Sequence, residues 1–197
     1  MPAWHIFMEA AKTLDDAGID FVLCGGIAVR LYGRVRETTD VDFLISEEDV
    51  DQALEFLGEA GFKIKRTDPR WLFQAFKDTS KVDLIFEAMG AVRLSEEVRE
   101  HAKPAEIEGY TYRVIAPEDL LIMKAHSLSE ERPRDLFDAF SIIKETDGKL
   151  DWHYFLDRSR PRAQRMLGLL LFAKSEHEIS AFVPGWVIQR LVSYLPT

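Results

Sequence analysis

Three aspartates in apolar stretches are the residues of this sequence whose types and spacing point to chemistry. Asp40 and Asp42 alternate with apolar residues in the stretch DVDF, and Asp83 lies in the otherwise apolar run 82–86. Because residues i and i+2 of a strand point to one face, Asp40 and Asp42 project together, about 7 Å apart. Two such carboxylates repel each other unless a cation or basic side chains neutralise them. Hard oxygen ligands suit Mg²⁺ or Mn²⁺, so the three aspartates predict a metal site.

A pair of glycines precedes these acids. Gly25 and Gly26 follow the apolar run 21–24, and the 13 residues 27–39 separate Gly26 from Asp40. A strand that ends in two glycines lets a phosphate approach the backbone, and a following helix directs its free amides at the same place. Any tight turn uses glycine, so this pattern indicates a phosphate site only in combination with the aspartates.

The combined pattern resembles the signature of the polymerase-beta-like nucleotidyltransferase superfamily: hydrophobic–Gly–Gly, a gap, Asp–hydrophobic–Asp–hydrophobic, and a later strand aspartate. The resemblance is close over 20–90 and looser to 145, and the stretch looks most like minimal nucleotidyltransferases and nucleotidyltransferase toxins of abortive-infection systems. It implies that Gly25 and Gly26 border the triphosphate of an NTP. It also implies that Asp40 and Asp42 bind two metal ions, and that Asp83 binds one and helps to deprotonate the acceptor hydroxyl.

Basic residues fit the same interpretation. Arg34 and Arg36 lie just before the acids, where guanidinium groups can bind phosphate oxygens bidentately, although a solvated loop explains them equally well. Lys124 matches a position where relatives often carry a lysine that meets nucleotide or pyrophosphate; a surface helix lysine is the alternative. Four further residues resemble a helix start of the toxin-like relatives, namely Arg132, Arg134, Asp135 and Asp138.

Composition limits the possible partners. The net charge of −9 and pI near 5.1 disfavour general binding to nucleic acid, whose phosphates require Lys and Arg. A local patch of Arg158, Arg160, Arg162 and Arg165 stays open as an exception. The single cysteine, Cys24, is expected in the core and permits no intrachain disulfide. No signal peptide and no membrane-spanning apolar stretch is evident, so the sequence predicts a cytoplasmic protein without membrane contact.

Hydrophobic periodicity predicts the elements that position these residues. Apolar spacing and turn residues indicate strands at 21–24, 41–45, 62–65, 72–76, 82–86 and 110–115, with 72–86 forming a hairpin. Helices are expected at 4–17, 27–32, 46–58 capped by Ser46, from Pro117 onward, at 134–144, and over much of 150–197; a charged segment precedes 108. The expected fold is α/β (α+β), with a mixed central sheet flanked by helices. We expect a nucleotidyltransferase core at 1–115 and a helical region at 116–197 packed on it.

The sequence thus predicts a metal-dependent nucleotidyltransferase that moves a nucleoside monophosphate from an NTP, such as ATP, to a hydroxyl and releases pyrophosphate. The acceptor stays open between a small molecule such as an aminoglycoside-like antibiotic, a tRNA 3′ end, and a protein hydroxyl as in toxin–antitoxin pairs. Two alternatives remain. One is a non-catalytic nucleotide- or partner-binding module of toxin–antitoxin type with a cognate protein partner. The other is a nuclease that uses the acidic cluster without NTP.

Overall fold

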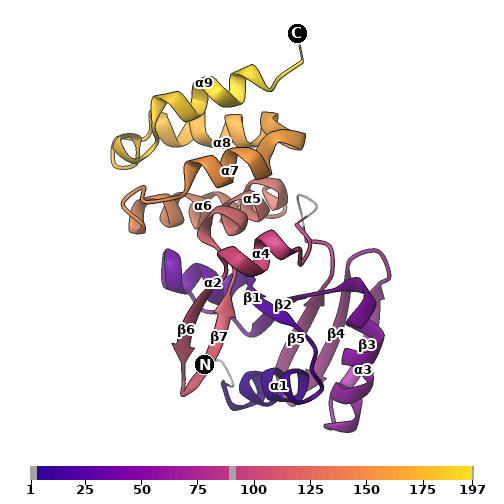
Figure 1. The fold of residues 1–197 in the computed structure, drawn as a ribbon. Helices are drawn as coiled ribbons and strands as arrows, with labels where there is room; N and C mark the ends of the chain where they lie inside the picture. Colours follow the sequence, from indigo (N-terminus) through magenta and orange to yellow (C-terminus); the bar gives the residue numbers. More distant parts are fainter. Residues whose placement is uncertain (1–3, 89–91, 197) are drawn as a thin grey trace. The chain divides into compact units, whose positions relative to one another are not determined.

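The computed structural model describes residues 4–88 and 92–196 and divides into two compact units (Figure 1). Within the described residues, unit 1 comprises the chain up to Ala28 together with Arg36–Ala116. Unit 2 comprises Val29–Val35 and the chain from Pro117 onward. The division passes through helix α2 (Gly25–Tyr32), whose first turn belongs to unit 1 and whose second half belongs to unit 2.

Unit 1 is built on a mixed sheet with strand order β3-β4-β5-β2-β1-β7-β6. β2 pairs in parallel with β5, and β1 in parallel with β7, while the other pairings are antiparallel. The bounds are β1 (Phe21–Cys24), β2 (Asp40–Ile45), β3 (Lys63–Asp68), β4 (Leu72–Lys77), β5 (Ser80–Ile85), β6 (Lys103–Ile107) and β7 (Tyr110–Val114). This mixed sheet with flanking helices confirms the predicted fold class.

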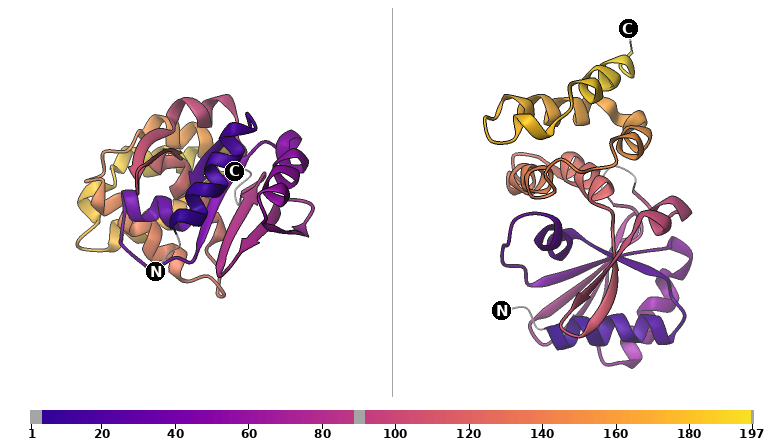
Figure 2. Two further views of the ribbon diagram at one scale, coloured as in Figure 1. Left: turned by 90° about the horizontal axis from the view of Figure 1, so that it is seen from below. Right: turned by 60° about the vertical axis from the view of Figure 1, so that its left-hand side comes forward.

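Helices α1 (Trp4–Asp16) and α3 (Val50–Glu59) pack together over one face of this sheet (Figure 2). α1 buries apolar residues at three- and four-residue spacing, which is the periodicity of a helix with one face in the core. In β2, Val41 and Phe43 are fully buried whereas Asp40 and Asp42 are partly exposed. Since successive side chains of a strand alternate between faces, the two aspartates lie on the sheet face opposite Val41 and Phe43.

Local differences from the sequence-based elements have physical causes. The helix after β1 begins at Gly25 itself, so the two glycines form its first turn instead of a loop before residue 27. Ser46 makes no side-chain cap, because a 3₁₀ turn (Glu47–Asp49) separates it from α3. The charged segment before residue 108 contains α4 (Glu96–His101) and the edge strand β6.

Unit 2 is helical, as predicted for the C-terminal part. Its helices are α5 (Pro117–Ser127), α6 (Arg134–Glu145), α7 (Trp152–Ser159), α8 (Ala163–Ser175) and α9 (Gly185–Ser193). α5 packs against α6, α7 and α8, and α9 packs on α8 and α7. Pro117 opens α5 with Glu118 and Asp119 in its first turn, a favoured arrangement at the positive end of a helix. No helix in the described ranges is long and apolar enough to cross a bilayer.

Candidate functional site

The parallel pairing of β2 and β5 brings the three predicted aspartates onto adjacent strands. Asp42 pairs in register with Asp83, and Asp40 pairs with Lys81. Neighbouring strands lie about 4.8 Å apart, so side chains in register on one face are direct neighbours. The sheet therefore brings together Asp40, Asp42 and Asp83, which we call the acid row, from segments that are about 40 residues apart in the chain.

The start of α2 lies directly against Asp42. The backbone amide of Gly26 donates a hydrogen bond to Asp42 Oδ2 at 3.3 Å. Gly25 has a φ of +62°, and a Cβ at this position would overlap the Asp42 carboxylate. Both properties require glycine at position 25, because an L side chain rarely adopts this φ and would displace the carboxylate.

Crowding of negative charge perturbs Asp42. Burial, followed by the negative charges of Asp40 and Asp83, raises the pKa of Asp42 to about 7. The Gly26 amide and the Lys81 ammonium act in the opposite direction but do not compensate. Burial and the two neighbouring carboxylates thus favour the protonated form of Asp42.

Lys81 lies between the other two acids. Its Nζ is 3.1 Å from Asp40 Oδ2 and 2.7 Å from Asp83 Oδ2. Burial works against the charged ammonium, but hydrogen bonds and attraction from Asp83 and Asp40 outweigh it and raise the pKa of Lys81. Lys81 is therefore a firmly protonated cation that joins β2 to β5.

Two polar side chains hold the remaining carboxylate oxygens. Thr38 donates its hydroxyl to Asp40 Oδ1 at 2.5 Å, and Gln74 of β4 donates its amide to Asp83 Oδ1 at 2.8 Å. Burial alone would raise the pKa of Asp40, but the Thr38 hydrogen bond and the charge of Lys81 lower it below its ordinary value. Asp40 is thus ionised at neutral pH.

The charge and the oxygen ligands of the acid row suit a divalent cation. Asp40, Asp42 and Asp83 with Lys81 carry three negative charges and one positive charge, a formal sum of −2 when all are ionised. The donors are hard oxygens, which Mg²⁺ and Mn²⁺ prefer. In the described ranges, no three acidic, histidine or cysteine side chains already converge on one point as a metal would require. In this arrangement the Lys81 ammonium lies between Asp40 and Asp83.

A second charged cluster lies within unit 2, and we call it the helical charge cluster. The Nζ of Lys124, on α5, is 2.8 Å from Asp135 Oδ1 and 3.0 Å from Asp138 Oδ2, both on α6. Arg34 Nε binds Asp138 Oδ1 at 2.9 Å, and Arg132 Nε binds Asp135 Oδ2 at 2.9 Å. Lys124, Asp135 and Asp138 are buried. This cluster ties the end of α2 and helix α5 to α6.

The structure thus separates the predicted site residues into two groups. Asp40, Asp42, Asp83, Gly25 and Gly26 lie together in unit 1. Arg36 belongs to the same neighbourhood, because one of its terminal nitrogens would be 3.1 Å from a Cβ built on Gly26. Arg34 and Lys124 instead have ion-pair partners in the helical charge cluster, and their role in nucleotide binding stays a prediction.

Sequence reasoning assigned no role to three residues that contact the acids: Thr38, Gln74 and Lys81. Lys81 carried a usable signal, because it stands two residues before Asp83 in the same strand and must share its face. Gln74 carried none, since its place beside Asp83 depends on the register of the β4–β5 hairpin.

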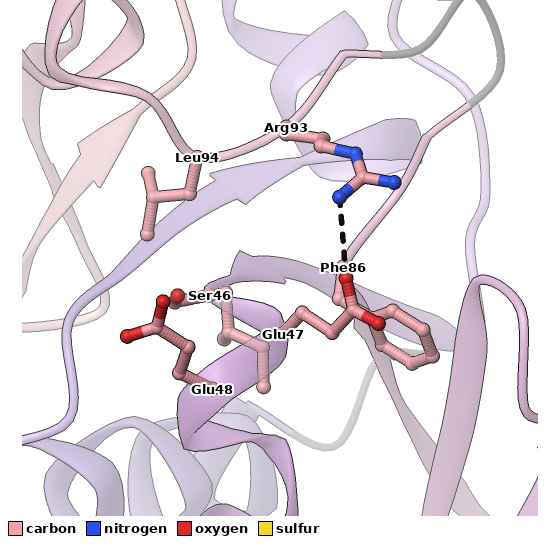
Figure 3. A pocket seen from close by; sticks show the side chains of 7 residues that line it. Ser46, Glu47, Glu48, Phe86, Arg93 and Leu94 are labelled. Carbon is pink, nitrogen blue, oxygen red and sulfur yellow. Dashed lines mark hydrogen bonds and ion pairs between the residues drawn. The ribbon is translucent and has the colours of Figure 1, made fainter.

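A pocket of about 270 Å³ in unit 1 lies at the other end of β2 (Figure 3). It is lined by Ile45 and Phe86 at the strand ends and by Ser46, Glu47, Glu48, Arg93 and Leu94. Arg93 forms ion pairs with Glu47, at 3.2 Å, and with Glu87. The five residue-to-residue steps from Asp40 to Ile45 span about 16 Å of strand, so this pocket is separate from the acid row.

Comparisons with known proteins identify a family for this chain and structures of similar fold. Residues 3–161 match the family described as "Nucleotidyl transferase of unknown function (DUF2204)". The antibiotic-resistance factor ANT(2″)-Ia is structurally similar, with a TM-score of 0.59 and 15% identity over 87% of this chain and 97% of that one. The lincomycin-bound lincosamide antibiotic adenylyltransferase LnuA is similar too, with a TM-score of 0.51 and 15% identity over 69% and 95%.

At such low identity these two structures establish a shared fold alone. A search of curated protein sequences gives no match. The family match covers most of the chain, including the acid row and the helical charge cluster. The chain therefore belongs to this family of nucleotidyltransferases.

Proposed function

We propose that this protein transfers a nucleoside monophosphate from an NTP to the hydroxyl of an acceptor and releases pyrophosphate, using the acid row of Asp40, Asp42 and Asp83. The observation that carries the proposal is the charge deficit of that row beside the first turn of α2. A carboxylate whose pKa is raised to about 7 by burial and by two other carboxylates is costly to keep, and function is a reason to keep it.

In this reaction a bond forms between the acceptor oxygen and the α-phosphorus, and the bond from the α-phosphorus to the bridging oxygen breaks. The bonding electrons leave with pyrophosphate, and the acceptor proton passes to a carboxylate, for which we propose Asp83. Asp40, Asp42 and Asp83 would hold a divalent cation, or two such ions in the fullest arrangement, which would supply positive charge for the attacking and leaving oxygens. Backbone amides at the start of α2 favour phosphate oxygens near Gly25 and Gly26.

For the acceptor we propose a small hydroxylated molecule rather than RNA. The chain carries 25 basic against 34 acidic residues, which disfavours a polyanionic partner. Three arginines of the sequence-based basic patch have local partners. Arg158 pairs with the buried Asp119 at 3.0 Å, Arg165 donates to the Leu128 carbonyl, and Arg160 lies over the Tyr194 ring. The similar fold of a lincosamide adenylyltransferase and an antibiotic-resistance factor also supports a small acceptor.

One observation favours the alternative of a non-catalytic nucleotide- or partner-binding module. The ammonium of Lys81 already bridges Asp40 and Asp83, so the row is partly neutralised without metal. A protein that only bound a partner would need no metal there.

Transfer is tested directly with NTPs labelled at the α-phosphate, Mg²⁺, and three acceptor pools: hydroxylated small molecules, total tRNA, and cellular proteins. We expect label in one small-molecule product together with stoichiometric pyrophosphate, and none with Asp42→Asn. Label in tRNA or in protein would replace the proposed acceptor class. Nucleotide binding without label in any pool would support the non-catalytic alternative.

A further inference from the structure

We propose that the Lys81 ammonium and a divalent cation compete for one position between Asp40 and Asp83, so that Lys81 sets the metal affinity of the acid row. This inference rests on the proposed function, because it assumes that the row binds metal. It assigns to Lys81 a role as a positioning residue, distinct from the residues that would hold the ion.

The distances from Lys81 to the two carboxylates show that the ammonium occupies the position that a cation between Asp40 and Asp83 would take. Nζ of Lys81 is 3.1 Å from Asp40 Oδ2 and 2.7 Å from Asp83 Oδ2, so both oxygens already face one cationic point. Oxygen ligands of Mg²⁺ lie about 2.0–2.1 Å from the ion. Each carboxylate therefore needs to move by only about 1 Å to exchange an ammonium for the ion.

The two cations exclude each other. An ammonium about 3 Å from a divalent ion in this partly buried place would be strongly repelled, since screening by water is incomplete there. Strand register reinforces the conflict, because Lys81 is paired directly with Asp40 and stands two residues before Asp83 on the same face.

Lys81 has room to leave. Its side chain is 31% exposed, and a lysine head group on a flexible four-carbon stem can turn into water without moving the strand. Lys124 in unit 2 makes the contrast clear: it also bridges two carboxylates, but its side chain is only 7% exposed. The greater exposure of the Lys81 side chain thus makes its ammonium displaceable, whereas the buried ammonium of Lys124 is held in place.

The first test measures the binding of Mn²⁺ in the absence of nucleotide, monitored by electron paramagnetic resonance. The wild type, Lys81→Met and Lys81→Arg are compared. We expect Lys81→Met to bind Mn²⁺ about tenfold more tightly or better, and Lys81→Arg to stay near the wild type. Lys77→Met is the matched control, because Lys77 ends the neighbouring strand and pairs with Glu9 instead of the acid row. Equal or weaker Mn²⁺ binding by folded Lys81→Met would overturn the inference.

A second test uses the unmodified protein and avoids any folding defect of the variant. Lysines are acetylated briefly with and without Mg²⁺, and the modified peptides are quantified by mass spectrometry. We expect Mg²⁺ to increase acetylation of Lys81 and to leave Lys77 unchanged. No increase at Lys81 under Mg²⁺ concentrations that raise the melting temperature would contradict displacement.

The outcomes of the two proposals are separable. Tighter Mn²⁺ binding by Lys81→Met without nucleotidyl transfer in any acceptor pool would reject the proposed reaction and keep the competition. Transfer by the wild type with unchanged Mn²⁺ affinity in Lys81→Met would keep the reaction and reject the competition.

Discussion

Two clusters of buried or partly buried charge in this protein have opposite charge balance. The helical charge cluster joins two carboxylates, Asp135 and Asp138, to three cations. In the acid row the Lys81 ammonium bridges Asp40 and Asp83, and the third carboxylate, Asp42, accepts a hydrogen bond from the Gly26 amide. The first has a formal sum of +1 and the second of −2.

The comparison separates a cation-rich from a cation-poor arrangement of the same residue types. Burying a charge is costly unless partners and hydrogen bonds satisfy it, and in the helical charge cluster every carboxylate has cationic partners. At Asp42, burial and the charges of Asp40 and Asp83 outweigh the hydrogen bond from the Gly26 amide and the attraction of Lys81. Such a deficit is expected where a ligand supplies the missing charge.

The largest effect is expected on activity in the acid row. Asp42→Asn keeps the shape of the side chain but removes its charge, and should lower nucleotidyl transfer by about 10²–10³-fold or more. Product formation in single-turnover experiments measures it. Wild-type rates in this variant would mean that the charge deficit has no catalytic purpose.

The helical charge cluster should respond in stability instead. Lys124→Met leaves two buried carboxylates without their shared ammonium and should cost about 3–5 kcal/mol of unfolding free energy. Urea denaturation measures the loss. Lys149→Met is the control, because the Lys149–Asp147 pair is exposed and such pairs contribute about 0–1 kcal/mol. Similar losses in both variants would remove the distinction between buried and exposed pairs.

The pH dependence of stability should distinguish the clusters further. The pKa of Asp42 is raised from 3.8 to about 7 in the folded state, so the unfolded chain ionises this group first. Stability from this group is full below pH 3.8 and is lost as the pH rises through 7.

Metal-free Asp42→Asn should therefore be more stable than the wild type at pH 8, by about 2–4 kcal/mol, with the difference vanishing near pH 4. Denaturant midpoints at a series of pH values, in the presence of a chelator, provide the measurement. A wild type that is the more stable protein at pH 8 would show that Asp42 is adequately neutralised.

The smallest effect concerns the contact between α2 and the acid row. Gly25 and Gly18 both have positive φ, but an added Cβ meets Asp42 at position 25 and nothing within 4 Å at position 18. Gly25→Ala should therefore cost about 1–2 kcal/mol more than Gly18→Ala, the excess that overpacking adds to backbone strain. Equal costs would indicate that the Asp42 carboxylate moves aside freely.

Sequence patterns predicted the elements whose apolar periodicity is strong. The β4–β5 hairpin, the strands that carry Asp40, Asp42 and Asp83, and the helix from Pro117 are present in the structure. The edge strand β6 was not anticipated, because Lys103–Ile107 is largely exposed and lacks the alternation of a half-buried strand. Local pattern also could not assign Val29–Val35 to unit 2, since that assignment depends on contacts distant in sequence.

The sequence predicted where the charged residues lie in the strands and helices better than it predicted which charged residues pair with each other. Acid spacing indicated a shared face for Asp40 and Asp42, but the ion pairs of Arg34 and Lys124 join residues about 100 and 11 positions apart. No periodicity encodes such pairs, because they depend on how helices pack. Lys81 was recognisable in principle from its spacing to Asp83.

The most direct test of the central claim is the melting temperature of the wild type and of Asp40→Asn/Asp42→Asn, titrated with Mg²⁺ and each of the four NTPs. A ligand that binds only the folded state raises the melting temperature by mass action. We predict a rise with Mg²⁺ and at least one NTP in the wild type that is lost in the double variant. An equal rise in both proteins would contradict the assignment of the acid row as the metal and nucleotide site.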